Sequence, residues 1–180
     1  MKDTNEGFIK EYRLRGVKFP PRPWLSDEAF NEACLVFIRV CADVFFIQKE
    51  KGIIYLAYRI IPIRAWMGFG GAVDPGEGVI EAGCRNVKQD TGLEIPAKKL
   101  CYLDQTRITY LAYGEPRDSL AFQFYCEVKP GEIDSIRLNS KEYDVQQGVQ
   151  SFNKDRLMQE QSLLHPEVMD TFNLIFSQTA

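Results

Sequence analysis

The sequence predicts an α+β fold in which a mixed central sheet is sandwiched between flanking helices. Residues 34–59 and 100–128 are rich in β-branched and aromatic residues, as strands are. Residues 78–91, between these two segments, repeat their apolar residues with a helical period, and helix-like segments follow after residue 150. Strands, one helix, more strands and then helices form the order expected of a sheet covered by helices.

The composition is that of an ordinary globular protein. The chain has 180 residues, 45% of them hydrophobic and 26% charged, which suits one domain with a sizeable core. Residues 1–23 are charged and end in FPPRP, so we expect an arm followed by a domain of residues 24–180. The net charge is −3 and no Lys/Arg stripe is present, which argues against nucleic acid or an anionic membrane as a partner.

The cysteines and the N-terminus indicate a cytoplasmic protein. The five cysteines are irregularly spaced within apolar runs, without a CxxC pair or a Cys/His cluster, which argues against a zinc site. We expect them to be buried free thiols in a reducing compartment. No apolar signal core and no run of about 20 apolar residues is present.

The first half of the domain reads as a helix, a hairpin and a glycine-rich strand. Ser26 is suited to cap a short helix that runs to about Ala33. Residues 34–48 are apolar on both faces, which predicts a central strand, and a KEKG turn joins them to a second strand at 53–59. A short strand and loop follow at residues 66–73.

The second half begins with an amphipathic helix at residues 78–91, which ends at Gly92. Its predicted buried stripe consists of Ile80, Cys84, Val87 and Thr91. The remaining expected elements are strands at 100–113, 119–128 and, more weakly, 145–152, then helices at 155–164 and 166–176.

The loop and helix around residues 70–91 carry the residue types of a ligand site. Gly70 and the glycine after it permit a tight turn and a close approach of the backbone to a ligand. Glu77 lies just before the helix and Arg85 about two turns later, so an ion pair between them could brace the loop. Asp90 lies in the last turn, where the helix dipole disfavours an acid that is neither solvated nor balanced by a cation.

This spacing resembles the Nudix box, G-x5-E-x7-R-E-U-x-E-E-x-G-U, in which U is aliphatic. The matching residues are Gly71, Glu77, Arg85, Val87, Gly92 and Leu93, with Gly70 beside them. The resemblance implies an α/β/α sandwich and a hydrolase that uses Mg2+ or Mn2+. The three glutamates that follow the arginine in the family are Asn86, Gln89 and Asp90 here, so we expect a reduced site with one metal ion.

The pattern is most similar to the GDP-mannose mannosyl hydrolase branch of the Nudix family, which also lacks the first two of these glutamates. The resemblance implies metal ligation by the Gly71 carbonyl, Asp90 and Glu142, and catalytic roles for Glu142, Arg85 and Asp90. Arg59 falls where that branch has a phosphate-binding arginine, and Tyr143 falls near its general-base histidine. Arg85, Glu77 and Gly70 would hold the loop in place.

Aromatic residues around the predicted sheet are candidates for substrate binding. Trp66 and Phe69, and less strongly Phe37, could contact a nucleobase, although aromatic residues beside a sheet more often belong to the core. His165, the only histidine, is more often structural in such a position.

Two functions therefore stay open. The first is a metal-dependent hydrolase that acts on a nucleoside diphosphate linked to another group, such as a nucleotide sugar. The alternative is a catalytically silent Nudix-fold module that binds a nucleotide or a protein, because two of the box acids are neutral. The expected partner is a small-molecule nucleotide, and a homodimer is compatible with the sequence.

Overall fold

The computed structural model describes residues 26–177, so the expected arm at residues 1–23 lies outside the described residues. Within that range the strands are β1 (Arg39–Gln48), β2 (Ile53–Arg59), β3 (Ala65–Met67), β4 (Phe69–Ala72), β5 (Cys101–Ala112), β6 (Glu115–Glu127) and β7 (Val149–Phe152). The α-helices are α1 (Asp27–Val36), α2 (Val79–Thr91), α3 (Pro130–Asp134), α4 (Lys154–Gln159) and α5 (Glu167–Ser177).

The strands form one mixed sheet in the order β3-β2-β1-β6-β5, with β4 paired to β1 and β7 paired to β2. β1 is parallel to β6 and antiparallel to both β2 and β4. Residues 41–48 of β1 are all buried, so its two apolar faces are explained by its central place in the sheet.

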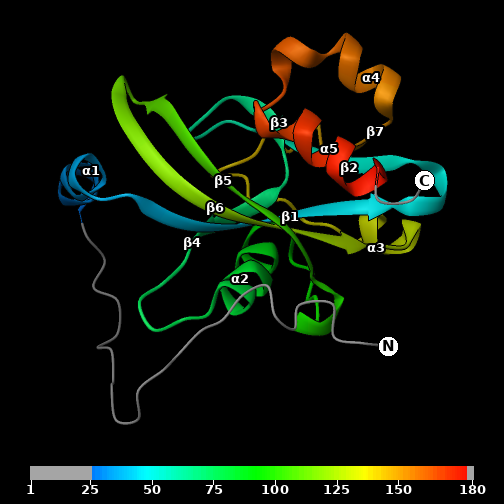
Figure 1. The fold of residues 1–180 in the computed structure, drawn as a ribbon, viewed down its shortest axis with the longest axis horizontal. Coiled ribbons are helices and arrows are strands. Elements are labelled where there is room, and N and C mark those ends of the chain that lie inside the picture. The colour runs from blue at the N-terminus through cyan, green and yellow to red at the C-terminus, as the bar shows by residue number, and fades with distance from the viewer. Residues whose placement is uncertain (1–25, 178–180) are drawn as a thin grey trace.

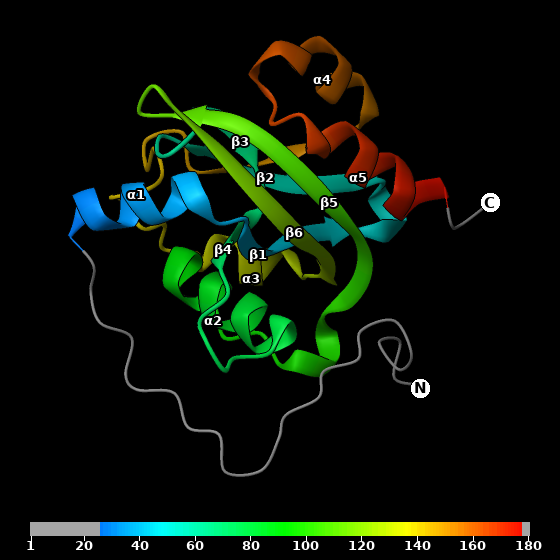
Figure 2. The same ribbon diagram turned by 60° about the vertical axis from the view of Figure 1, so that its left-hand side comes forward.

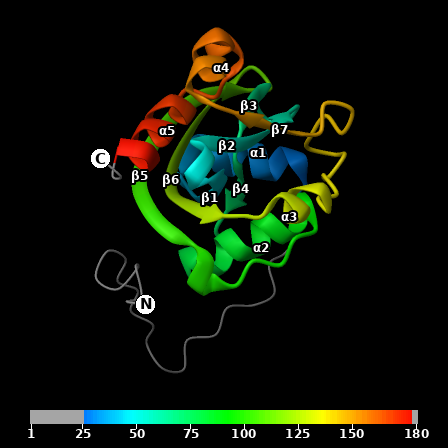
Figure 3. The same cartoon turned by 90° about the vertical axis from the view of Figure 1, so that its right-hand side faces the viewer.

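Helices cover both faces of the sheet, which confirms the predicted fold class. α2 lies on one side, whereas α4 and α5 lie on the other (Figure 1), and the same three layers are visible from the side in Figure 3. One core fills the space between α2 and the sheet around Phe46, Phe69 and Phe124. A second core lies under α4 and α5 around Phe45, Trp66 and Phe172. None of the described helices is long and apolar enough to cross a membrane.

β5 and β6 form a long curved hairpin at one edge of the sheet (Figure 2). Its turn uses Tyr113 (φ 55°) and Gly114 (φ 81°), as a tight two-residue hairpin turn requires. β6 therefore begins four residues before the predicted strand and includes Pro116. The proline is tolerated because the pairing of β6 with β1 begins only at Ser119, so its missing N–H breaks no bond to β1.

Two predicted elements differ in their limits. The helix predicted to end near Ala33 continues to Val36, and the first strand begins at Arg39 instead of residue 34. The ladder between β1 and β6 also begins at Arg39, so residues 35–38 have no strand partner in the sheet. They are exposed apolar residues, which explains why apolar character alone predicted a strand that is too long.

The buried side of α2 also differs from the predicted stripe. Val87 and Thr91 are buried as expected, whereas Ile80 and Cys84 are only partly buried. The helix instead turns Asn86 and Asp90 inward. The expected burial of all the thiols is likewise wrong, because only Cys41 and Cys126 are buried, although all five cysteines are free.

Candidate functional site

A groove of about 430 Å³ runs between α2, β4 and the end of β2. β2 contributes Arg59, β4 contributes Gly70 and Gly71, and the loop before β7 contributes Glu142. α2 contributes Arg85, Asn86, Gln89 and Asp90. The structure thus brings most of the candidate residues of the sequence to one place.

Arg85 and Glu77 form a two-pronged ion pair beside this groove. Arg85 Nε donates to Glu77 Oε1 at 2.8 Å, and Arg85 Nη2 donates to Oε2 at 2.6 Å. Arg85 also donates to the Ala72 carbonyl at 2.9 Å, and the Asp74 amide donates to Glu77 at 3.0 Å. Burial opposes ionisation of Glu77, but the hydrogen bonds from Arg85 and Asp74 lower its pKa. The pair therefore ties the loop after β4 to α2.

The two amide side chains that replace box glutamates are held by the same arginine. Arg85 Nη1 donates to Asn86 Oδ1 at 2.8 Å and to Gln89 Oε1 at 3.1 Å. Their oxygen atoms therefore already accept hydrogen bonds from a cation. Since they also carry no charge, they are weak ligands for a hard metal ion.

Asp90 is buried, with 4% of its surface exposed. Its Oδ2 accepts hydrogen bonds from the Gly70 amide at 3.0 Å and from the Tyr143 hydroxyl at 2.7 Å. Burial raises the pKa of Asp90 to about 6, and the nearby positive charge of Arg59 opposes this rise only in part. The acid at the end of α2 is therefore not solvated and instead lies near a cation.

Arg59 links the parts of the groove. Its Nη2 pairs with the Glu142 carboxylate, its Nη1 donates to the Gly70 carbonyl at 3.0 Å, and its Nε donates to the Ile61 carbonyl at 2.8 Å. The guanidinium lies 5.3 Å from the centre of the Tyr143 ring. Burial alone would lower the pKa of Arg59, but Tyr143, Glu142 and other acidic neighbours raise it, so the side chain is a permanent cation.

Tyr143 is buried and donates its hydroxyl proton to Asp90. Burial raises its pKa well above the ordinary value. The residue that falls near the histidine base of the GDP-mannose branch is therefore a hydrogen-bond donor that holds Asp90. A proton acceptor in the groove must be another group, and Glu142 is a partly exposed carboxylate that lines it.

Solved structures with the same fold are Nudix proteins. A MutT Nudix hydrolase from Burkholderia pseudomallei is 19% identical, with a TM-score of 0.59, over 77% of this chain and 98% of that chain. A C. elegans Ap4A hydrolase is 20% identical, with a TM-score of 0.54, over 78% and 96%. The chain has the Nudix fold. No protein-family model and no curated protein matches the sequence.

A further neighbour with the same fold was solved with a metal ion bound. A bifunctional NMN adenylyltransferase/ADP ribose pyrophosphatase from Francisella tularensis, complexed with AMP and a manganese ion, is 12% identical with a TM-score of 0.53. The match covers 79% of this chain and 42% of that chain. Nudix hydrolases generally use divalent metals such as Mg2+ or Mn2+.

The charge and donor atoms of the groove fit a single divalent cation. Its charged lining residues are Arg39, Arg59, Arg85, Asp74, Asp90 and Glu142. The three acids offset the three arginines, so a diphosphate would meet no net positive charge without an added cation. Carboxylate oxygens are also the donors that Mg2+ prefers. Within residues 26–177 no three His, Cys, Asp or Glu side chains are grouped to hold a metal, so a cation in this groove would need backbone or amide oxygens as well as carboxylates.

The predicted substrate contacts of Trp66 and Phe69 are wrong. Trp66 is 3% exposed and packs edge-on against Tyr58 and Phe152, in the core under α4 and α5. Phe69 is fully buried against Phe46 on the α2 side. Trp66 lies in β3 and Phe69 in β4, and both strands are short and largely buried. The sequence pattern therefore could not show that the two rings point into the cores.

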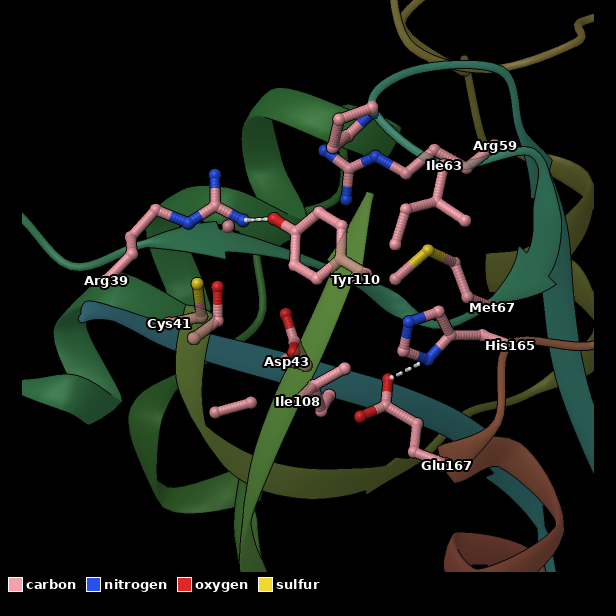
Figure 4. Close-up of a pocket in the computed structure, with 14 residues that line it drawn as sticks. Arg39, Cys41, Asp43, Arg59, Ile63, Met67, Ile108, Tyr110, His165 and Glu167 are labelled. Atoms are coloured by element: carbon pink, nitrogen blue, oxygen red, sulfur yellow. Dashed lines mark hydrogen bonds and ion pairs between the residues drawn. The ribbon is translucent and has the colours of Figure 1, made fainter. Parts of the chain in front are cut away.

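A second cavity, of about 70 Å³, adjoins the groove and shares Arg39, Arg59, Pro62 and Gly71 with it. Its polar lining includes Arg39, Asp43, Tyr110, His165 and Glu167 (Figure 4). Sequence reasoning did not find Arg39, Asp43 or Glu167 because distant segments bring them together. The local signals were Arg39 and Asp43, two charged residues in a mostly apolar strand.

Two groups in this cavity have unusual surroundings. Burial, together with the charge of Glu167, raises the pKa of Asp43 to about 7. Arg39 donates from Nη2 to the Tyr110 hydroxyl at 2.7 Å. No acid within the described residues forms an ion pair with Arg39, so its charge is available to an anionic ligand.

Proposed function

We propose that the chain is a Nudix-type hydrolase that cleaves a nucleoside diphosphate linked to another group, with nucleotide sugars as the first candidates. The observation that carries this proposal is the meeting of Arg59, Asp90 and Glu142 in one groove beside the Arg85–Glu77 pair. The Nudix fold supports the reaction class, and the resemblance to the GDP-mannose branch supports the sugar. A groove of about 430 Å³ is of the size that small-molecule ligands occupy.

Two arginines are suited to bind the phosphates. Arg39 has no ion-pair partner among the described residues, and its Nε is buried without a hydrogen-bond partner there. Arg59 uses one N–H on each of its three nitrogens for protein contacts, which leaves two further N–H groups at the edge of the groove. Guanidinium groups bind phosphate oxygens well because their N–H groups match them in charge and spacing.

The Gly71 carbonyl, Asp90 and Glu142 would hold one Mg2+ or Mn2+. When bound, such an ion neutralises the diphosphate and polarises it for attack. Glu142 would also accept the proton of the attacking water, since it is the partly exposed carboxylate of the groove. Arg85 would act as a positioning residue, because it donates a hydrogen bond to the carbonyl of Ala72, next to Gly71 in β4.

Turnover of a substrate panel tests the proposal. We would incubate the protein with nucleotide sugars, ADP-ribose and dinucleoside polyphosphates, each with Mg2+ or Mn2+ and with EDTA. We expect metal-dependent cleavage of at least one compound, lost in Glu142→Gln and kept in Glu94→Gln, a matched change at an exposed residue outside the groove. No cleavage of any compound at high protein concentration would contradict the hydrolase.

A silent binding module is the second candidate, and one observation favours it. Asn86 and Gln89 remove two charges from the box, and Arg85 already holds both of their oxygens. Calorimetry with ADP, with and without metal, separates the two functions. Tight binding in EDTA, with no product after long incubation, would favour the module.

A cytoplasmic location and a homodimer are further proposals. The five free cysteines support a reducing compartment, which fractionation of cells would test. An apolar surface between the end of α1 and the hairpin tip supports a contact between two copies, and Phe37 on it is 70% exposed. Light scattering should give a dimer mass that falls to the monomer mass in Phe37→Asp. A monomer at every concentration would exclude this contact.

A further inference from the structure

The cavity behind the groove is lined by two buried acids, Asp43 and Glu167. Asp43 is 8% exposed, and Figure 4 shows its carboxyl group directed into the cavity from β1. Within residues 26–177 no side chain or backbone group forms a hydrogen bond or ion pair with it. Ser119 Oγ, in the same lining, is buried and also lacks a partner there. Polar groups this buried are normally paired, so their place in one cavity points to a polar ligand.

A buried chain of polar side chains fixes the opposite wall. Thr171 donates to Gln123 at 3.3 Å, and Gln123 donates to Glu167 Oε2 at 2.9 Å. His165 Nδ1 then lies 3.2 Å from the other oxygen, Glu167 Oε1, as the dashed line in Figure 4 marks. All four residues are at most 6% exposed. Such a chain is costly inside an apolar core, and it holds the carboxylate in one orientation.

The size and walls of the cavity suit the edge of a flat ring. About 70 Å³ is too little for a nucleotide, but the cavity adjoins the groove of about 430 Å³. Met67 and Ile108 are apolar residues in the wall of the cavity (Figure 4). Arg39 lines both spaces, so a ligand with its phosphates on this arginine can reach the cavity with its other end.

We propose that this cavity receives the amino-bearing edge of a nucleobase, with Asp43 and Glu167 as the acceptors of its N–H groups. Adenine and cytosine carry an amino group at the ring position where hypoxanthine and uracil, respectively, carry a carbonyl oxygen. A carbonyl oxygen facing two ionised carboxylates leaves all of them unpaired, which is how a buried polar site rejects the wrong ligand. The inference rests on the proposed function, because the base belongs to the diphosphate bound in the groove.

Two matched ligand pairs test the inference by calorimetry on the full chain, with Mg2+ present and at pH 8.5, where Asp43 with its pKa of about 7 is ionised. ADP and IDP differ in the amino or oxo group at one ring position, and so do CDP and UDP. We expect the amino member of at least one pair to bind ten times more tightly or better. Asp43→Asn and Glu167→Gln should each reduce this ratio to less than threefold, because an amide presents an N–H group in place of one acceptor oxygen.

The control variant is Asp104→Asn, the same chemical change at an exposed residue of β5, which should keep the ratio. Circular dichroism would establish that each variant is folded. If only one of the two cavity variants folds, that variant alone is enough to test the inference. Ratios below twofold in both pairs would overturn the inference while leaving the proposed function intact. A tenfold ratio that survives in a folded cavity variant would also overturn it. If none of the four diphosphates binds, the inference fails, whereas the proposed function is decided separately by the turnover panel.

Discussion

Replacing Asp90 by Asn should change how the stability of the protein depends on pH. Burial raises the pKa of Asp90 from its ordinary 3.8 to about 6 in the folded chain. The folded state therefore binds the proton more tightly than the unfolded state does. The stability that proton binding at Asp90 contributes is fully present below about pH 4 and is lost as the pH rises through 6. A shift of about two units corresponds to roughly 3 kcal/mol, since each unit is worth about 1.4 kcal/mol.

The asparagine variant has no proton to lose, but its side-chain oxygen can accept the same hydrogen bonds from Gly70 and Tyr143. We therefore expect the free energy of unfolding of the variant, relative to that of the parent protein, to rise by roughly 3 kcal/mol between pH 4 and pH 7.5. For a chain of this length, that difference moves the relative Tm by about 6–12 °C.

Urea unfolding at four pH values between 4 and 7.5 measures this difference, with Asp104→Asn as the exposed control. The control curve should run parallel to that of the parent protein. If the curve of Asp90→Asn is also parallel across this range, then Asp90 does not carry a burial cost and the electrostatic reasoning is wrong. The same variant should lose any metal-dependent activity, since it removes one of the two carboxylates of the proposed cation site.

Two further predictions concern β4 and the loop that joins it to α2. Glu77→Gln should lower stability by about 1–2 kcal/mol at pH 7, since a charged pair of hydrogen bonds is lost. Because the pKa of Glu77 is lowered, the difference should shrink as the pH falls below about 4.5, and urea unfolding at pH 7 and pH 3 would detect this. Gly70→Ala should destabilise the fold by more than about 2 kcal/mol, because the new Cβ would lie 2.5 Å from the Ala42 carbonyl oxygen. Gly131→Ala, which meets open space, should have a small effect on the Tm, and equal effects would contradict the crowding at Gly70.

The sequence could predict those parts of the site that lie close together in the chain. Gly70, Glu77 and Arg85 belong to one loop and one helix, so their spacing alone implied the ion pair that the structure contains. The same holds for β1, because a strand that is apolar on both faces can only be central. Local spacing carries this information because loop and helix geometry is set within a few residues.

The cavity could not be predicted, because its residues meet only through the sheet. Asp43 comes from β1, Tyr110 from β5, and Glu167 from the start of α5. The predicted role of Trp66 was wrong for a related reason. β3 has only three residues, all buried, so no alternation of buried and exposed residues shows which way the Trp66 side chain points. Side-chain direction in so short a strand depends on the partner strands and not on the residues themselves.

The orientation of α2 determines which of its polar side chains face the groove. Asn86 and Asp90, four residues apart, both face inward, one against the Ala72 carbonyl and the other against the Gly70 amide. A carboxylate in place of Asn86 would crowd a second negative charge beside Asp90, whose pKa is already raised by burial. The neutral amide instead lets Arg85 hold the loop without that repulsion, and Asp90 stays next to Arg59 as the acid of the helix that faces the groove. The neutral residues at positions 86 and 89 thus leave Asp90 as the acid of α2 that lines the groove, while Arg85 still ties the loop after β4 to the helix.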